Sequence, residues 1–360
     1  MQPFTLRILL SFTLVALLAA CSGSSGEAAD TTVGPATTAA PTTTTVAPTT
    51  TTTAPTTTTT SAPMATTTTI PDAAFTETEG FTYLTIDGEA LEGDIYVPEG
   101  EGPWPVVVMF HGYSWVGKDD SEITVVAEAA AAAGMRVFVP DWPMVTDVFM
   151  PEFFDPVTAI ANCAVAYAQP DPDDSVPIVV YGFSAGAVPA SFAALSPASE
   201  PIPGCVAVNP PAPITGAVLG DSEYFLRSTL FDPAFDADQE AMQAGIAEMV
   251  DPSHWPPDME TRFFLWAVDC GPALRTFDDP WDETGWLAQR DPDGSIRDDL
   301  DRLGQLDDGV ISAIDEAELL GLRLEEAGIE VNVERHPGGH TSLDKVPELV
   351  DYLTQAAGIS

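Results

Sequence analysis

The sequence predicts a mostly parallel, doubly wound α/β sheet with helices on both faces for the region from residue 75 to residue 360. Runs typical of strands alternate with runs typical of helices along this region, which is the pattern of such a sheet. The runs at 106–110 and 178–181 are continuously apolar, as strands covered by helices on both faces require. Since no internal repeat interrupts the alternation, we expect one domain.

The expected elements follow from these runs in chain order. The first two expected strands lie close together in the sequence, as in a hairpin. The expected strands are 81–86, 94–97, 105–110, 135–140, 176–181, 205–208, 262–268 and 329–334. The expected helices are 121–133, 156–168, 185–195, 310–327 and 345–357.

The charge composition excludes one class of partner. The chain has 12 Lys and Arg residues against 55 Asp and Glu residues, a formal net charge of −43. The chain therefore has too few basic residues to form a surface that neutralises phosphates, and we expect no nucleic-acid partner. The four cysteines lack C-x-x-C spacing, and no glycine-rich phosphate loop follows a strand, so we expect neither a metal site nor a cofactor.

The N-terminus has the features of an export signal. Arg7 precedes an apolar run at 8–20 that is too short to span a bilayer comfortably. The run ends in Leu-Ala-Ala-Cys21, which resembles the lipobox of bacterial lipoproteins. The resemblance implies that residues 1–20 are a signal peptide and that Cys21 is acylated, which would anchor the protein to the outer face of the bacterial cell membrane or to the outer membrane. Ordinary cleavage that leaves a free Cys21 is the alternative.

The segment that follows, 21–74, has no globular character. Residues 31–70 contain 22 threonines, five prolines and no charged residue, so nothing in them can form a core. Such tracts stay extended and resemble the glycosylated stalks of surface proteins. We expect a disordered spacer between the anchor and the domain, with glycosylation as a further expectation.

A G-x-S-x-G motif marks the expected nucleophile. Gly182-Phe-Ser184-Ala-Gly186 stands directly after the expected strand 176–181 and directly before an alanine-rich helix. This placement is what a nucleophile on a strained strand-to-helix turn requires, since glycines two residues away on each side give the turn room. Ser184 is therefore the expected nucleophile.

A serine hydroxyl needs a base to take its proton, and the chain has only four histidines. His340 follows the last expected strand in a loop with two glycines before it, which lets an imidazole reach the carboxyl edge of the sheet. We expect His340 to be the base, with His336 as the alternative.

The expected acid is Asp269, because the strand 262–268 runs directly into it and places its carboxylate at the same edge of the sheet. Asp278 and Asp279, in the loop that follows, are the alternatives.

The order Ser184, Asp269, His340 resembles that of serine esterases of the α/β-hydrolase family, over essentially all of residues 75–360. The segment 106–115, ending in His-Gly-Tyr-Ser-Trp, resembles the oxyanion strand and the His-Gly-Gly-Gly-Trp motif of the family's esterase branch, with Tyr113 and Ser114 in place of the last two glycines.

The resemblance implies where an oxyanion would bind and how the chain is modified. Backbone N–H groups of Tyr113 and Ala185 would form the oxyanion hole, with Gly112 as a further donor. Some secreted bacterial esterases have cysteines near the places of Cys163 and Cys205, so a disulfide between them is one of two expectations, the other being free thiols.

Two inserts interrupt the pattern. The first, 212–260, follows the sixth expected strand, and in this fold it would lie over the active site as a lid. The second, 271–308, is acidic and rich in turns, and no role is predicted for it.

The expected function is therefore carboxylic ester hydrolysis through an acyl-enzyme at the cell surface, on a small-molecule, lipid or polymer ester. A serine peptidase, thioesterase or polyester hydrolase of the same fold is an alternative. A non-catalytic binding or adhesion module on a hydrolase fold is the alternative outside enzymes, although such a module has no need for a complete triad.

Overall fold

The computed structural model describes residues 74–86, 88–114, 117–118, 120–142, 154–169, 176–221, 251–268, 293–305 and 312–359. The expected signal peptide, Cys21 and the threonine-rich segment up to residue 73 lie outside the described residues. Within the described ranges, no helix is long and apolar enough to cross a membrane.

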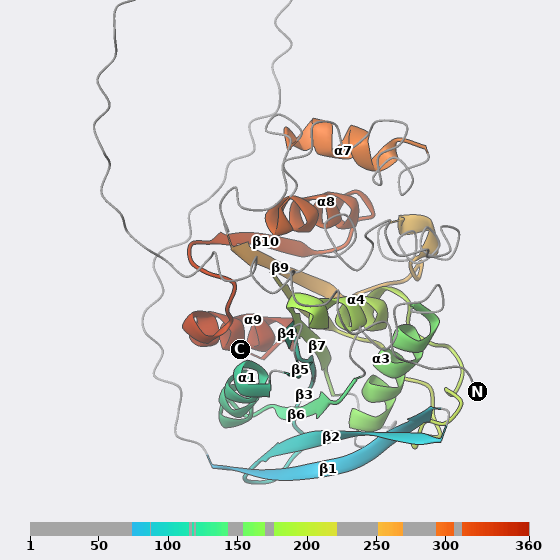
Figure 1. The fold of residues 1–360 in the computed structure, drawn as a ribbon, viewed down its shortest axis with the longest axis vertical. Helices are drawn as coiled ribbons and strands as arrows, with labels where there is room; N and C mark the ends of the chain where they lie inside the picture. The colour runs from blue at the N-terminus through green and yellow to red at the C-terminus, as the bar shows by residue number, and fades with distance from the viewer. Residues whose placement is uncertain are drawn as a thin grey trace, which may run out of the picture. The chain divides into compact units, whose positions relative to one another are not determined.

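The core of the domain is an eight-stranded sheet in the order β1-β2-β6-β3-β7-β8-β9-β10 (Figure 1). β2 runs antiparallel to both of its neighbours, and all the other neighbouring strands are parallel. This confirms the predicted mostly parallel sheet. The strands are β1 (Phe75–Ile86), β2 (Glu89–Pro98), β3 (Val106–Phe110), β6 (Arg136–Pro140), β7 (Ile178–Phe183), β8 (Gly216–Gly220), β9 (Arg262–Val268) and β10 (Val331–His336). Two short strands, β4 (Tyr113–Ser114) and β5 (Gly117–Lys118), pair separately.

Helices cover both faces of the sheet because the central strands are apolar on both faces. In β3, Val106, Val108 and Phe110 join one buried cluster, while Val107 and Met109 join the other. This two-residue alternation is the pleat of a strand. On the first face lie α3 (Phe154–Ala168), α4 (Ala187–Leu195) and α8 (Ala313–Glu326); on the second lie α1 (Asp120–Ala132) and α9 (Val346–Ala356). A further described helix, α7 (Ser295–Leu303), packs against α8.

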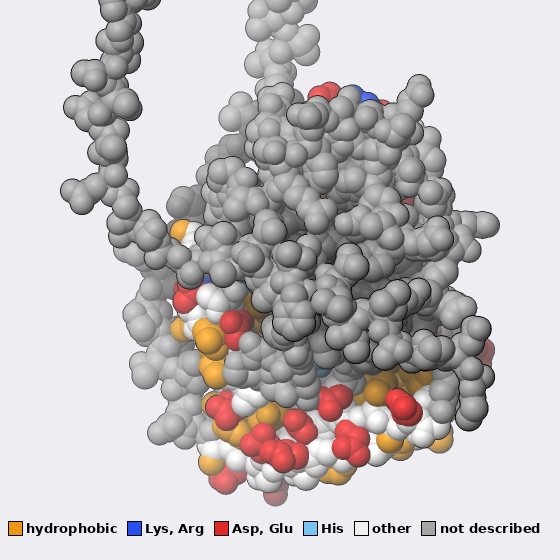
Figure 2. All heavy atoms as spheres, in the orientation of Figure 1, with side chains coloured by type: hydrophobic (Ala, Val, Ile, Leu, Met, Phe, Trp, Pro, Cys, Tyr) orange, Lys and Arg blue, Asp and Glu red, His pale blue; other side chains and the backbone are white. Residues whose placement is uncertain are grey.

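The hairpin β1–β2 forms one edge of the sheet and exposes acidic side chains. Glu77 and Glu79 on β1, with Glu89 and Glu92 on β2, are all exposed, and Figure 2 shows acidic groups gathered over this part of the molecule. Charged side chains on an edge strand oppose pairing with a strand of another chain. The high acidic content of the chain therefore protects this edge.

One predicted strand is wrong, and one strand of the eight-stranded sheet, β8, was not predicted, nor were the two short strands β4 and β5. Residues 205–208 form only an isolated antiparallel bridge between Cys205 and Leu84, and Val208 is 80% exposed. The strand at this point of the sheet is β8, whose sequence is Gly-Ala-Val-Leu-Gly. Glycines are typical of loops, so the sequence of β8 did not indicate a strand. In the structure these glycines are required because neighbouring side chains leave no room for a Cβ. A Cβ on Gly216 would lie 2.5 Å from Cβ of Ala356 in α9, and one on Gly220 would lie 2.2 Å from the Trp266 ring.

The position of β8 also changes the expected inserts. The first insert, predicted as 212–260, contains β8 at its start, so the chain between β8 and β9 is shorter than predicted. Residues 222–250 of this insert lie outside the described residues, and a single turn of 3₁₀ helix, η4 (Pro252–His254), lies near its end. The second insert, 271–308, contains α7.

A disulfide joins Cys163 of α3 to Cys205, the pairing that the sequence left open, with the two Cα atoms 5.7 Å apart. The segment that contains Cys205 also bonds to the outer edge of β1. The Thr85 N–H donates to the Gly204 carbonyl at 3.0 Å, and the Val206 N–H donates to the Tyr83 carbonyl at 2.8 Å. The disulfide therefore ties the chain that covers part of this edge to a core helix.

We predict that removing this disulfide lowers the free energy of unfolding by about 2–4 kcal/mol, because a cross-link of this sequence separation restricts the unfolded chain. The measurement is urea unfolding of the wild type and of the Cys163→Ala, Cys205→Ala double variant, with and without dithiothreitol. Dithiothreitol should destabilise the wild type and leave the double variant unchanged. An equal response in both proteins would contradict the prediction.

Candidate active site

The expected nucleophile lies on a strained turn between β7 and α4. β7 ends at Phe183, and the single 3₁₀ turn η2 (Ser184–Gly186) leads into α4. Ser184 has φ +54°, in the left-handed region that residues with a Cβ rarely adopt. The two motif glycines make this turn possible. A Cβ on Gly182 would lie 2.3 Å from the Gly186 carbonyl oxygen, and one on Gly186 would lie 2.1 Å from the carbonyl oxygen of Phe110 at the end of β3.

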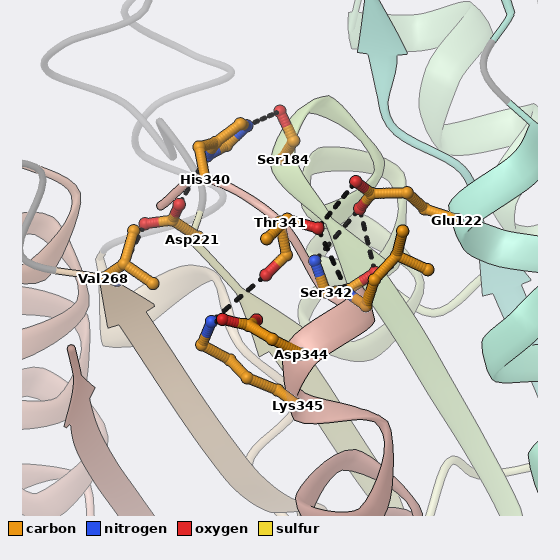
Figure 3. Close-up of polar contacts among 10 residues, drawn as sticks. Glu122, Ser184, Asp221, Val268, His340, Thr341, Ser342, Asp344 and Lys345 are labelled. Atoms are coloured by element: carbon orange, nitrogen blue, oxygen red, sulfur yellow. Dashed lines mark hydrogen bonds and ion pairs between the residues drawn. The ribbon is translucent and has the colours of Figure 1, made fainter. Parts of the chain in front are cut away.

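The structure brings His340 onto Ser184. His340 lies in the loop between β10 and the 3₁₀ turn η5 (Leu343–Lys345), and its Nε2 is 2.9 Å from Ser184 Oγ. Its Nδ1 contacts the Oδ2 atom of Asp221 (Figure 3). A carboxylate only accepts hydrogen bonds, so the Nδ1–H donates to Asp221 and Nε2 is left to accept the Ser184 hydroxyl proton. This is the tautomer that a base for Ser184 needs.

Asp221 is a buried carboxylate whose oxygens both have partners. It directly follows β8, and its side chain is 2% exposed against 40% for His340. Its Oδ1 accepts the Val268 N–H at 3.0 Å, and its own N–H donates to the Trp266 carbonyl at 2.7 Å. Within the described residues, Asp221 and Ser184 are the two non-glycine residues with a positive φ. The backbone is thus strained at both ends of the hydrogen-bonded chain.

Aromatic rings cover one side of the His340 imidazole. The centroid of the Phe183 ring is 4.8 Å from that of the imidazole, and the Phe183 ring stacks on Trp266 at 5.7 Å with an interplanar angle of 8°. The indole of Trp266 packs directly against Gly220, where a Cβ would not fit. Packing and hydrogen bonds therefore act together to fix the plane of His340.

The expected acid, Asp269, lies outside the described residues, as do its alternatives Asp278 and Asp279. Among the residues that the structure describes, the carboxylate that contacts His340 is that of Asp221, which we did not predict. The same rule that selected Asp269, an aspartate directly after a strand, would have selected Asp221 had β8 been recognised.

The alternative base, His336, is engaged elsewhere. It ends β10, its Nε2 is 3.1 Å from the Tyr352 hydroxyl of α9, and its ring meets Trp266 edge-on. Burial lowers the pKa of His336 below the ordinary value for histidine, which favours a neutral ring. His336 therefore belongs to the packing between β10 and α9.

The residues expected to supply oxyanion donors lie beside Ser184. A Cβ on Gly112 would lie 3.3 Å from Ser184 Cβ and 3.2 Å from the Phe183 carbonyl oxygen, so a side chain there would crowd the nucleophile. Tyr113 begins β4, which contacts η2. Ala185 is the second residue of η2, at the entry to α4, where backbone N–H groups have no acceptor within the helix.

Among the residues that the structure describes, no group of three or more His, Cys, Asp or Glu residues lies close enough to hold a metal ion. The residues around Ser184 instead form a hydrogen-bonded chain suited to proton transfer.

Comparison with known proteins gives the following matches. Residues 93–210 match the BD-FAE family model. No curated protein matches the chain in sequence. Among solved structures, esterase 2 of the planctomycete Thermogutta terrifontis with propionate bound is 15% identical, with a TM-score of 0.48, over 81% of this chain and 96% of that one. The same esterase phosphonylated by cyclosarin is 16% identical with a TM-score of 0.48, and its apo form is 15% identical with a TM-score of 0.49. Both of these cover 81% of this chain and 96% of the other.

We predict that Asp221→Asn slows the reaction of Ser184 with a fluorophosphonate by about 10²–10⁴-fold, because an amide favours the wrong imidazole tautomer and balances no developing charge. Asp269→Asn is the matched control and should change the rate by no more than about threefold. The measurement is the second-order labelling rate, with circular dichroism to show that each variant folds. Slow labelling of Asp269→Asn beside normal labelling of Asp221→Asn would return the acid to Asp269.

Proposed function

We propose that this protein is a carboxylic ester hydrolase that works through an acyl-enzyme on Ser184. The observation that supports it is the continuous hydrogen-bonded chain from the Ser184 hydroxyl through His340 to the buried Asp221. A binding surface gains nothing from a hydroxyl held at a strained φ and aimed at an imidazole, whereas a nucleophile needs both.

In the proposed reaction, His340 Nε2 takes the Ser184 hydroxyl proton as Oγ bonds to the carbonyl carbon of the ester. The imidazolium then gives that proton to the alkoxide oxygen as the ester C–O bond breaks, which releases the alcohol and leaves an acyl-serine. Water attacks the acyl-serine with His340 again as the base. The acid product leaves, and the Ser184 hydroxyl regains its proton.

Asp221 and the backbone around the nucleophile stabilise the charges that form. Asp221 faces the positive charge that develops on His340, and its carboxylate is oriented by the Val268 N–H, which donates to Oδ1. The Tyr113 and Ala185 amides, with Gly112 as a further donor, would bind the negative oxygen of the tetrahedral intermediate. Because amide donors do not depend on side-chain identity, Tyr113 and Ser114 at the family's glycine positions are compatible with this role.

We further propose that the enzyme acts at the cell surface on a lipid anchor. Support comes from the apolar run that ends at Cys21 and from the threonine-rich segment that separates Cys21 from β1. Several acyl chains at Cys21 would add about 0.8 kcal/mol of membrane affinity for each buried CH₂ group.

We predict that Ser184→Ala abolishes hydrolysis of nitrophenyl acetate, butyrate and octanoate and abolishes fluorophosphonate labelling, while the far-UV circular dichroism is unchanged. The serine hydroxyl is the bond-forming group, so no other side chain replaces it. Ser191→Ala is the matched control and should keep both activities. Ser191 lies on α4, and its hydroxyl donates a hydrogen bond to the Ala187 carbonyl.

A folded wild type that hydrolyses none of these esters and does not label would favour the non-catalytic binding module. A wild type that labels but cleaves only thioesters or peptides would move the function to those classes.

We predict that Cys21→Ser releases the protein from the membrane fraction or blocks its processing, because acylation needs the cysteine. The measurement is fractionation of cells expressing the full chain, together with labelling by a palmitate analogue. If the variant is processed normally and fractionates with membranes as the wild type does, the anchor proposal is wrong.

A further inference from the structure

We propose that Glu122, on the first turn of α1, is a positioning residue for His340. The inference rests on the proposed function and adds to it, since no contact of Glu122 with the substrate is involved. Glu122 holds the two residues that follow His340 in the chain, and through them it sets where the imidazole lies.

Three hydrogen bonds join Glu122 to this loop (Figure 3). Its Oε1 accepts the Thr341 hydroxyl at 2.8 Å. Its Oε2 accepts both the backbone N–H and the hydroxyl of Ser342, each at 3.0 Å. Ser342 is 1% exposed, so these bonds lie where water competes little. One carboxylate therefore accepts the hydroxyl groups of both Thr341 and Ser342 and the N–H of Ser342.

The loop needs such a support because its own sequence gives it little rigidity. His340 follows Pro337-Gly338-Gly339, and Gly338 has φ +127°, a conformation that other residues rarely adopt. Neither a strand nor a helix includes residues 337–341. In contrast, α1 is anchored in the core by Ile123 and Val126, both buried. Glu122 thus fixes an irregular loop to a helix that is packed in the core.

Lys345 holds the same loop from its other side. Its Nζ donates to the Thr341 carbonyl at 3.2 Å and to Asp344 at 2.6 Å, and it lies 5.7 Å from the centroid of the Trp266 ring. The side chain and the carbonyl of Thr341 are therefore fixed in opposite directions, the first by Glu122 and the second by Lys345. His340 therefore precedes, in the chain, a residue whose side chain and backbone carbonyl are both hydrogen-bonded.

This arrangement predicts a specific kinetic effect. If the loop shifts by about 1 Å, the line from Ser184 Oγ through the imidazole to Asp221 is broken, and such a misplacement costs about 10²-fold in rate. Substrate binding is not affected, because Glu122 is bonded to the His340 loop and not to the nucleophile turn. Loss of Glu122 should therefore lower kcat and leave KM nearly unchanged.

The test measures kcat, KM and the fluorophosphonate labelling rate of Glu122→Ala on a short-chain nitrophenyl ester. We expect kcat and the labelling rate to fall about 10- to 100-fold, with KM within about twofold of the wild type. Glu122→Gln should recover most of the loss, since its amide oxygen still accepts from Ser342 and its NH₂ can donate to the Thr341 hydroxyl. Glu128→Ala is the matched control, because Glu128 is exposed on the same helix, and it should leave both rates unchanged.

A second variant keeps the proposal testable if Glu122→Ala does not fold. Thr341→Val with Ser342→Ala removes the two hydroxyl donors from the loop and leaves Glu122 in place. It should lower kcat by about 5- to 20-fold, and adding these changes to a folded Glu122→Ala should cost almost nothing more, because all three side chains act through the same bonds.

Wild-type kcat in folded Glu122→Ala, or in the folded Thr341→Val, Ser342→Ala double variant, would overturn the proposal. A loss of kcat in Glu128→Ala equal to that in Glu122→Ala would also overturn it. The wild type and Ser184→Ala, assayed beside them, report on the proposed function separately. If the wild type labels but does not hydrolyse the ester, the labelling rates alone decide the role of Glu122. If the wild type neither hydrolyses the ester nor labels, the proposed function and the role of Glu122 fail together.

Discussion

The close approach of the nucleophile turn to the end of β3 is the constraint on which the site depends. Gly186 lies so near the carbonyl oxygen of Phe110 that no Cβ fits between them. A left-handed conformation costs a residue with a Cβ about 1–2 kcal/mol. Ser184 keeps this conformation because β7, which leads into the turn, and β3, which pairs with β7, are both wholly buried. The sheet's packing thus maintains a conformation that the local sequence would not choose.

Trp266 connects this turn to the rest of the site. It lies in the middle of β9, against the space left by Gly220, and its ring stacks on Phe183, the residue before the nucleophile. Its carbonyl accepts the N–H of Asp221, and Lys345 lies over its ring from the His340 loop. Trp266, through its ring and its carbonyl, therefore contacts all three segments that bear Ser184, Asp221 and His340. The three segments come from distant parts of the chain, and Trp266 gives them a common surface.

The parts of the structure that could be predicted are those in which local pattern and packing agree. The apolar runs of β3 and β7 predicted buried central strands. The motif around Ser184 and the glycines before His340 selected two residues that the structure places within hydrogen-bond distance of each other. The strand β8 was not predicted because its glycines are required by contacts with Ala356 and Trp266, which are distant in the sequence. With β8 unrecognised, nothing distinguished Asp221 among 55 acidic residues. Glu122 gave no signal either, since its role depends on where α1 meets the His340 loop.

The contact of His340 with Asp221, which follows β8, has a consequence for how this protein can change over time. In a hydrolase whose acid follows β9, the segment after that strand must keep a carboxylate within reach of the histidine. Here Asp221 supplies that carboxylate, and the Val268 N–H that ends β9 orients it through the backbone alone. If Asp221 is the acid, the residues between β9 and α7 need not supply a carboxylate for His340. A change in the length of that part of the chain would then leave the contact between His340 and Asp221 in place.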